Sequence, residues 1–128
     1  MKSVLMFLAA CGAVSLPASA MAQASGGDAQ AGKKAFIQCQ ACHTVDAKAP
    51  SRMGPSLLGV YGAKIGGRPG YDHYSKALSG TPGKWDDAKL DQWLTRPTKF
   101  AAGTSMAFAG VPDPKRRADL IAYLKTLK

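Results

Sequence analysis

The segment Cys39-Gln40-Ala41-Cys42-His43 places two thiols three positions apart and an imidazole directly after the second thiol. On a helical turn, side chains three positions apart lie on one face, so both thiols can reach the same flat group. Read as C-x-x-C-H, the segment is the attachment sequence of a c-type haem, whose two vinyl groups form thioethers with the cysteines. The histidine is then directed at the iron from one side of the ring.

Three other interpretations of this segment fail on specific points. A structural zinc site needs four ligands, and beyond residue 22 the chain offers only Cys39, Cys42, His43 and His73, two of which are sequence neighbours. A thioredoxin-like redox pair requires a βαβ context, and no strand pattern surrounds the segment. A structural disulfide between the two cysteines would leave the histidine unexplained.

The N-terminus has the parts of an export signal. Lys2 provides a positive charge, Val4–Leu16 is an apolar run, and Pro17 breaks this run before a group of small residues. The run is shorter than the roughly 20 apolar residues that span a bilayer. The sequence therefore predicts that this region directs export and does not form a membrane span.

Two overlapping cleavage sites of the A-x-A kind end at Ala20 and at Ala22, and we favour the second. We expect a signal peptide over 1–22 that is removed, followed by one domain over 23–128 in the periplasm of a Gram-negative bacterium. The alternative is a lipoprotein signal, in which a lipidated Cys11 would anchor the protein. The apolar stretch before that cysteine is very short and continues past it, which favours a soluble protein.

The composition places the chain among small, basic, globular proteins. Its 128 residues carry 17 lysines and arginines against 8 acidic residues, giving a formal charge of +9, and 46% of the residues are hydrophobic. This hydrophobic content excludes an intrinsically disordered chain. The basic charges do not form a block, and an exported protein rarely meets nucleic acid, so we expect no nucleic-acid partner.

Capping and breaking residues delimit three main helices. They are expected from Asp28 to about Cys42, from Asp86 or Asp87 to Pro97, and from Asp113 to the C-terminus. The last helix has Pro114 at its first position and an apolar stripe of Leu120, Tyr123, Leu124 and Leu127.

The segment over 47–70 is dense in glycine and proline and shows no alternation typical of strands. This segment is part of the connection between the first two expected helices, which has about 40 residues. A structureless loop of that length is rare unless a functional group organises it. We therefore expect an all-α fold in which three main helices and long Gly/Pro loops surround one buried haem.

The second protein ligand of the iron decides the function. Two strong ligands leave only electron transfer, whereas an open iron binds gases or peroxide. The candidates are His73, Met21, Met53 and Met106. Met106 is favoured because it lies in a loop between two helices, flanked by small residues that let the backbone bring its sulfur close.

Beyond these local features, five segments in order resemble a known family. They are Gly32-Lys33-Lys34-Ala35-Phe36, the C-x-x-C-H segment, Gly54-Pro55-Ser56-Leu57, the stretch from Gly103 to Gly110, and Arg117-Ala118-Asp119-Leu120-Ile121-Ala122-Tyr123-Leu124-Lys125. Over essentially the whole mature length, the chain is similar to class I cytochrome c, in particular its mitochondrial-like bacterial members.

The resemblance implies a role for each matching residue. Cys39 and Cys42 would hold one haem c covalently, His43 and Met106 would ligate its iron, Pro55 would orient the histidine through its carbonyl, Tyr74 and Trp85 would donate to the haem propionates, and Thr104 would act nearby. The chain also departs from the family. Ala63 stands where many relatives have an arginine that faces a propionate, which raises the question whether Arg68 replaces it.

The family's function carries over as an expectation. The protein would be a monomeric carrier of one electron and not an enzyme. Its partners would be redox complexes with acidic docking surfaces: a quinol:cytochrome c reductase, a terminal oxidase, a reaction centre or a soluble reductase. Two other functions stay open at this point: a haem with an open iron that binds nitric oxide or reduces peroxide, and a metal-free dithiol protein.

Overall fold

The computed structural model describes residues 26–128, all of them in helices, turns and loops apart from one isolated β-bridge between Lys64 and Lys84. The expected signal peptide, its cleavage sites and Cys11 lie outside the described residues. The helical elements are α1 (Ala29–Ala35), the 3₁₀ helix η1 (Phe36–Cys39), α2 (Lys76–Ser79), α3 (Asp87–Thr95), α4 (Pro97–Phe100) and α5 (Pro114–Thr126). The all-α fold predicted from the sequence is confirmed.

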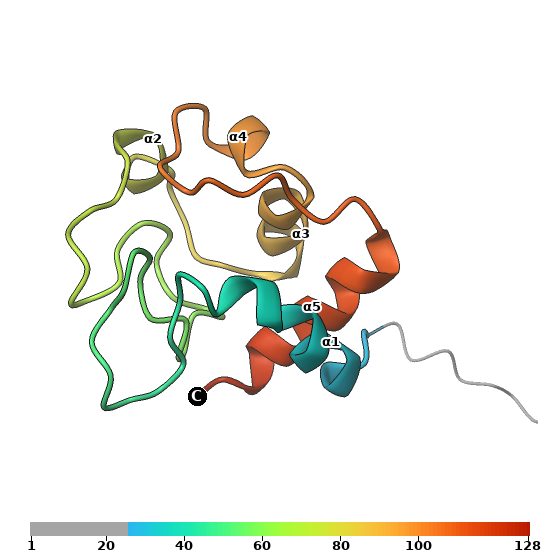
Figure 1. Ribbon diagram of the computed structural model, residues 1–128. Coiled ribbons are helices and arrows are strands. Elements are labelled where there is room, and N and C mark those ends of the chain that lie inside the picture. The colour runs from blue at the N-terminus through green and yellow to red at the C-terminus, as the bar shows by residue number, and fades with distance from the viewer. Residues whose placement is uncertain (1–25) are drawn as a thin grey trace, which may run out of the picture.

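The crossing of the first and last helices is the main tertiary contact of the fold (Figure 1). Gly32 lies at the crossing point, where a Cβ atom would stand only 1.9 Å from the carbonyl oxygen of Asp119. Beside it, the rings of Phe36 and Tyr123 pack with their centroids 5.2 Å apart. A glycine is required here because any side chain would push the two helices apart.

Local capping explains where the main helices begin. The side chain of Asp28 accepts hydrogen bonds from two backbone amides at the start of α1, and Asp86 and Asp113 each accept from one amide at the starts of α3 and α5. The first helix differs from the prediction in its second half. It is α-helical only to Ala35 and continues as the tighter η1 to Cys39, followed by a turn.

Two short helices were not predicted. Ser75 caps α2 by accepting from the amide of Leu78, and Pro97 opens α4. Arg96, between α3 and α4, has an extended backbone, which is the conformation that a following proline imposes. Pro97 therefore ends one helix, as predicted, and also starts the next.

The buried side chains come from every part of the described chain. Among the largest are Phe36, Ile65, Trp85, Trp93 and Leu120. As predicted, the Gly/Pro-rich segment over 47–70 contains no helix, and it runs as turns along one side of the molecule (Figure 1). Among the described residues, no helix is both long and apolar enough to cross a membrane.

Candidate functional site

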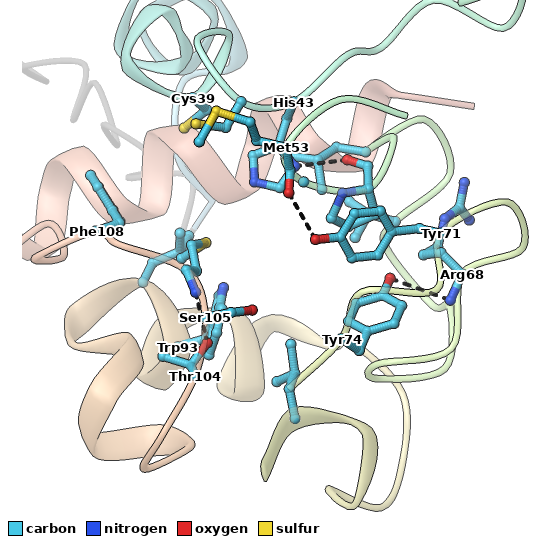
Figure 2. A pocket seen from close by; sticks show the side chains of 18 of the residues that line it. Cys39, His43, Met53, Arg68, Tyr71, Tyr74, Trp93, Thr104, Ser105 and Phe108 are labelled. Atoms are coloured by element: carbon cyan, nitrogen blue, oxygen red, sulfur yellow. Dashed lines mark hydrogen bonds between the residues drawn. The ribbon is translucent and has the colours of Figure 1, made fainter. Parts of the chain in front are cut away.

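A cavity of about 410 Å³ opens between the N-terminal segment, the Gly/Pro loops, α3 and α5. Its wall is mainly apolar and includes Leu57, Val60, Leu90, Leu94 and Leu124. Cys39 and His43 lie at one side of this cavity, and Thr104 and Ser105 lie across from them (Figure 2). Its size is within the range of cavities that bind cofactors.

His43 has one defined partner and little room to move. Its Nδ1 lies 2.7 Å from the carbonyl oxygen of Pro55. A carbonyl only accepts, so Nδ1 carries the proton in this contact and Nε2 keeps its lone pair. Gly54 touches the ring so closely that a Cβ atom would stand 2.4 Å from Cε1. Burial lowers the pKa of His43, which favours the neutral imidazole that binds a metal.

Cys39 and Cys42 are half-buried on the wall beside this histidine and have free thiols. The amides of Cys42 and His43 both donate to the carbonyl of Cys39, at 3.2 and 2.9 Å, which folds the segment into a single turn. Burial, followed by the neighbouring Cys42, raises the pKa of Cys39 to about 11. The geometry therefore gathers two thiols and one neutral imidazole on one wall of the cavity.

Met106 reaches the same cavity from the loop between α4 and α5. Its amide donates to the hydroxyl of Thr104 at 3.3 Å, and the amide of Thr104 donates to the carbonyl of Ala101 at 3.0 Å. Four residues after Met106, Gly110 has φ +108° and packs against α3, where a Cβ atom would stand 2.2 Å from the carbonyl oxygen of Thr95. The loop is thus fixed on both sides of the methionine.

The residues expected near the propionates lie in two different settings. Tyr74 lines the cavity and its hydroxyl accepts from the amide of Arg68 at 3.4 Å. Burial raises the pKa of Tyr74, so its phenol keeps its proton at neutral pH. Trp85 also lines the cavity and is buried in an aromatic group with Trp93 and Phe100, whose ring centroids lie 5.6 to 5.7 Å apart.

Arg68 lines the cavity beside Tyr74, whereas Ala63 is half-buried and does not line it. Its Nη1 donates to the carbonyl of Gly59 at 3.1 Å, and its Nη2 donates to the carbonyl of Leu58. Its Nε is buried and has no hydrogen-bond partner among the described residues. The guanidinium therefore places a positive charge in this wall, although Ala63 occupies the position at which the resemblance led us to expect an arginine.

Several contacts at the cavity were not predicted. Tyr71 donates from its hydroxyl to the carbonyl of Met53 at 2.8 Å, and its ring packs edge-on against Tyr74 and His73 (Figure 2). Met53 is 80% exposed, and His73 is exposed too. A hydrogen bond to a distant backbone carbonyl leaves no sequence pattern, so these contacts could be found only from the fold.

These residues fit a covalently held haem. A flat apolar ring matches the apolar wall, the two thiols lie beside it, and Nε2 of His43 is left with a free lone pair. Polar and positive groups for the haem propionates would come from Tyr74, Trp85 and Arg68. Among residues 26–128, no group of three histidine, cysteine, aspartate or glutamate residues is arranged to hold a bare metal ion.

Comparison with known proteins identifies the family. The sequence model of the family named cytochrome c matches residues 29–128. Cytochrome c from Guizotia abyssinica is 43% identical over 108 residues, covering 84% of this chain and 96% of that protein. Cytochrome c2 from Rhodomicrobium vannielii is also 43% identical over 108 residues, covering 84% of this chain and 85% of that protein. Among solved structures, cytochrome cH from Methylobacterium extorquens matches with a TM-score of 0.73 and 50% identity, covering 78% of this chain and 99% of its own.

The family match spans the C-x-x-C-H segment, the cavity wall and every helical element described. The likeness to cytochrome cH extends this agreement from the sequence to the fold. The chain belongs to the cytochrome c family: it binds one covalently attached haem c with its iron, and it is an electron carrier and not an enzyme.

Proposed function

We propose that this protein carries one electron at a time on a haem whose iron is ligated by His43 and Met106. The observation that carries the proposal is that these two side chains line one cavity although they are 63 positions apart in the sequence. The residues just before the methionine, Thr104 and Ser105, lie across the cavity from His43 (Figure 2). Two protein ligands leave no coordination position for a substrate, which favours electron transfer.

Each surrounding residue has a distinct part in holding this arrangement. Cys39 and Cys42 hold the ring through thioethers, and the Pro55 carbonyl keeps the histidine oriented, as a hydrogen-bond partner of a metal ligand does. Thr104 holds the backbone of Met106 by accepting from its amide. Tyr74 and Trp85 donate hydrogen bonds to the haem propionates. When bound, the haem supplies the redox chemistry, and a thioether ligand in a largely apolar cavity raises its reduction potential.

The charge of the surface supports docking to acidic partners. Seven basic side chains that could surround the docking area are all exposed: Lys33, Lys34, Lys48, Arg52, Lys99, Lys115 and Arg116. Opposite charges on a partner would speed the encounter and orient it. We propose that the protein acts as a periplasmic monomer between a quinol:cytochrome c reductase and a terminal oxidase, a reaction centre or a soluble reductase. The relative named cytochrome c2 is bacterial, which agrees with this location.

Optical spectra of the haem-loaded protein test the ligation. Sulfur ligation by Met106 predicts a far-red charge-transfer band in the ferric state and a low-spin ferrous spectrum that carbon monoxide does not change. A high-spin spectrum or rapid carbon monoxide binding would show an open iron, and the function would then be ligand binding or peroxide reduction.

The intact mass of the exported protein tests the processing. Cleavage after Ala22 predicts a chain that begins at residue 23 and carries one haem. A chain beginning at residue 21 would move the cleavage site to Ala20. A mass that starts at a lipidated Cys11 would replace the soluble form with a membrane-anchored one.

A further inference from the structure

Arg117 is the most buried arginine on α5, with 9% of its surface exposed, and it touches three separate parts of the fold. Its Nη1 donates to the backbone carbonyls of Val111 and Pro112, at 2.9 and 2.8 Å. Its Nε donates to the carboxylate of Asp91 on α3 at 2.8 Å. One guanidinium thus links α5, α3 and the end of the loop that carries Met106.

The two carbonyl contacts matter more than the ion pair. Val111 is buried, so water would reach its carbonyl poorly if Arg117 were replaced, and the carbonyl would be left without a partner. Asp91 is 48% exposed, so water can replace the guanidinium there at little cost. The planar fork of an arginine suits this task because it presents donors in fixed directions.

The loop end that Arg117 holds is also fixed directly to α3. The amide of Val111 donates to the carbonyl of Leu94 at 2.7 Å, and Gly110 packs against the backbone of Thr95. Between these ends, the backbone of Met106 makes two local bonds: its amide donates to the hydroxyl of Thr104 at 3.3 Å, and its carbonyl accepts from the amide of Phe108 at 3.0 Å. The position of the methionine sulfur therefore depends on what holds the two ends of its loop.

We infer that Arg117 is a positioning residue for Met106: by holding the carbonyls of Val111 and Pro112, it keeps the loop closed and the sulfur at the iron. This inference rests on the proposed ligation by Met106. Arg117 is not among the residues that line the cavity, and its hydrogen bonds to the loop go to backbone carbonyls, so its effect passes through the backbone of the loop. Loss of this contact would raise the fraction of molecules in which the loop is open.

Imidazole binding to the ferric haem-loaded protein measures that fraction. Imidazole takes the coordination position only after the sulfur of Met106 leaves it, so its apparent affinity rises in proportion to the open population. For Arg117→Met, which keeps a long apolar side chain but no donor, we expect about tenfold tighter imidazole binding. Arg117→Lys keeps the charge and can reach one carbonyl, so a smaller increase of about threefold is expected.

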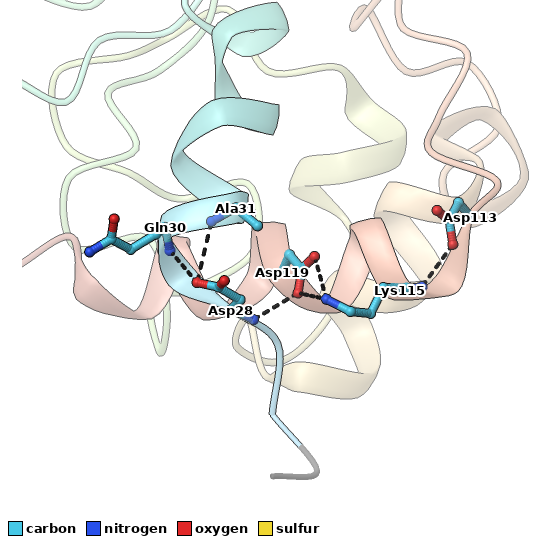
Figure 3. A network of polar contacts seen from close by, with 6 residues as sticks. All are labelled: Asp28, Gln30, Ala31, Asp113, Lys115 and Asp119. Carbon is cyan, nitrogen blue, oxygen red and sulfur yellow. Dashed lines mark hydrogen bonds and ion pairs between the residues drawn. The ribbon is translucent and has the colours of Figure 1, made fainter. Parts of the chain in front are cut away.

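The matched control is Asp119→Asn, on the same helix two positions away. Asp119 accepts from the amide of Asp28 at 2.7 Å and pairs with Lys115 at 2.8 Å (Figure 3). In the part of the chain that the structure describes, its side chain makes no hydrogen bond to the Met106 loop. Unfolding by guanidinium gives the global stability of each variant. The control should lower this stability and leave imidazole affinity unchanged.

Each outcome has one meaning. Imidazole affinity equal to wild type in the folded Arg117 variants overturns the inference, and so does an equal rise in the Asp119→Asn control. If Arg117→Met does not fold, Arg117→Lys decides by the same criterion. A wild-type protein without the ferric far-red band would instead overturn the ligation by Met106, so the two proposals fail through different observations.

Discussion

Replacing Gly32 by alanine sets helix propensity against helix packing. In an exposed helix interior, alanine is about 0.8–1 kcal/mol more favourable than glycine, so propensity alone predicts a more stable protein. At this position, however, the new Cβ would stand 1.9 Å from the carbonyl oxygen of Asp119 and 2.8 Å from the Cβ of Tyr123. The first of these atoms belongs to the backbone and the second is the first atom of a side chain, so neither can rotate away.

The geometry decides which effect is larger. Non-bonded atoms sit about 3.5 Å apart at the optimum, so α1 and α5 would have to separate by roughly 1.5 Å. Overpacking of this kind typically costs about 1–3 kcal/mol. The displacement also disturbs the contact between the rings of Phe36 and Tyr123, so we take the upper value. After subtracting the gain in propensity, Gly32→Ala should destabilise the protein by about 2 kcal/mol.

Guanidinium unfolding of the haem-loaded protein, followed by far-ultraviolet circular dichroism, measures this loss. With a slope of about 3 kcal/mol per molar, typical of a small domain, the midpoint should fall by roughly 0.7 M. Lys33→Ala is the matched control, because it places alanine at the next, exposed position of α1 and should leave the midpoint nearly unchanged. A midpoint for Gly32→Ala at or above that of wild type would refute the packing argument.

Three further predictions concern the site, acid stability and docking. Arg68→Gln removes a positive charge from the cavity wall, and this charge favours the reduced haem. A unit charge at ~10 Å with an effective dielectric constant of ~40 contributes about 0.8 kcal/mol, so the reduction potential measured by voltammetry should fall by some tens of millivolts. An unchanged potential would argue against that charge acting on the haem. Hydrogen bonds from Lys115, then from the amide of Asp28, hold the pKa of Asp119 below its ordinary value of 3.8. Its ionised form therefore stabilises the fold above that value and loses this effect as the pH falls through the lowered pKa, so wild type should lose more stability on acidification than Asp119→Asn in unfolding curves recorded at several pH values. Electron transfer to an acidic partner should slow as ionic strength rises in stopped-flow traces, and a salt-independent rate would exclude steering by the basic surface.

Features with local causes were predictable from the sequence. The starts of α1, α3 and α5 follow from aspartates whose carboxylates accept from amides two or three positions on, and the proline at the first position of α5 agrees with its fixed φ. The C-x-x-C-H segment predicted the covalent haem because covalent attachment requires two thiols at this spacing with a histidine directly after the second one. Membership of the cytochrome c family confirms that the protein binds a covalent haem.

Features that depend on distant backbone groups were not predictable. The guanidinium of Arg68 donates to the carbonyls of residues 58 and 59, and that of Arg117 donates to the carbonyls of residues 111 and 112. Every residue carries a carbonyl, so the sequence does not indicate which ones an arginine will meet. The short helix α2 was missed for a related reason, since four residues give too few positions for a hydrophobic period to be recognised.

The two proposed ligands of the iron are held in different ways, and this difference determines where the site will open first. His43 follows directly after the second of the two proposed attachment cysteines, and its ring is confined by Gly54 and hydrogen-bonded to Pro55. Moving it would require a shift of covalently anchored backbone. Met106 has no covalent neighbour at the haem and depends on hydrogen bonds at the two ends of its loop, each worth about 0.5–1.5 kcal/mol. Perturbations by pH, denaturant or mutation should therefore release the methionine while the histidine stays bound, and an added ligand should always enter from the methionine side.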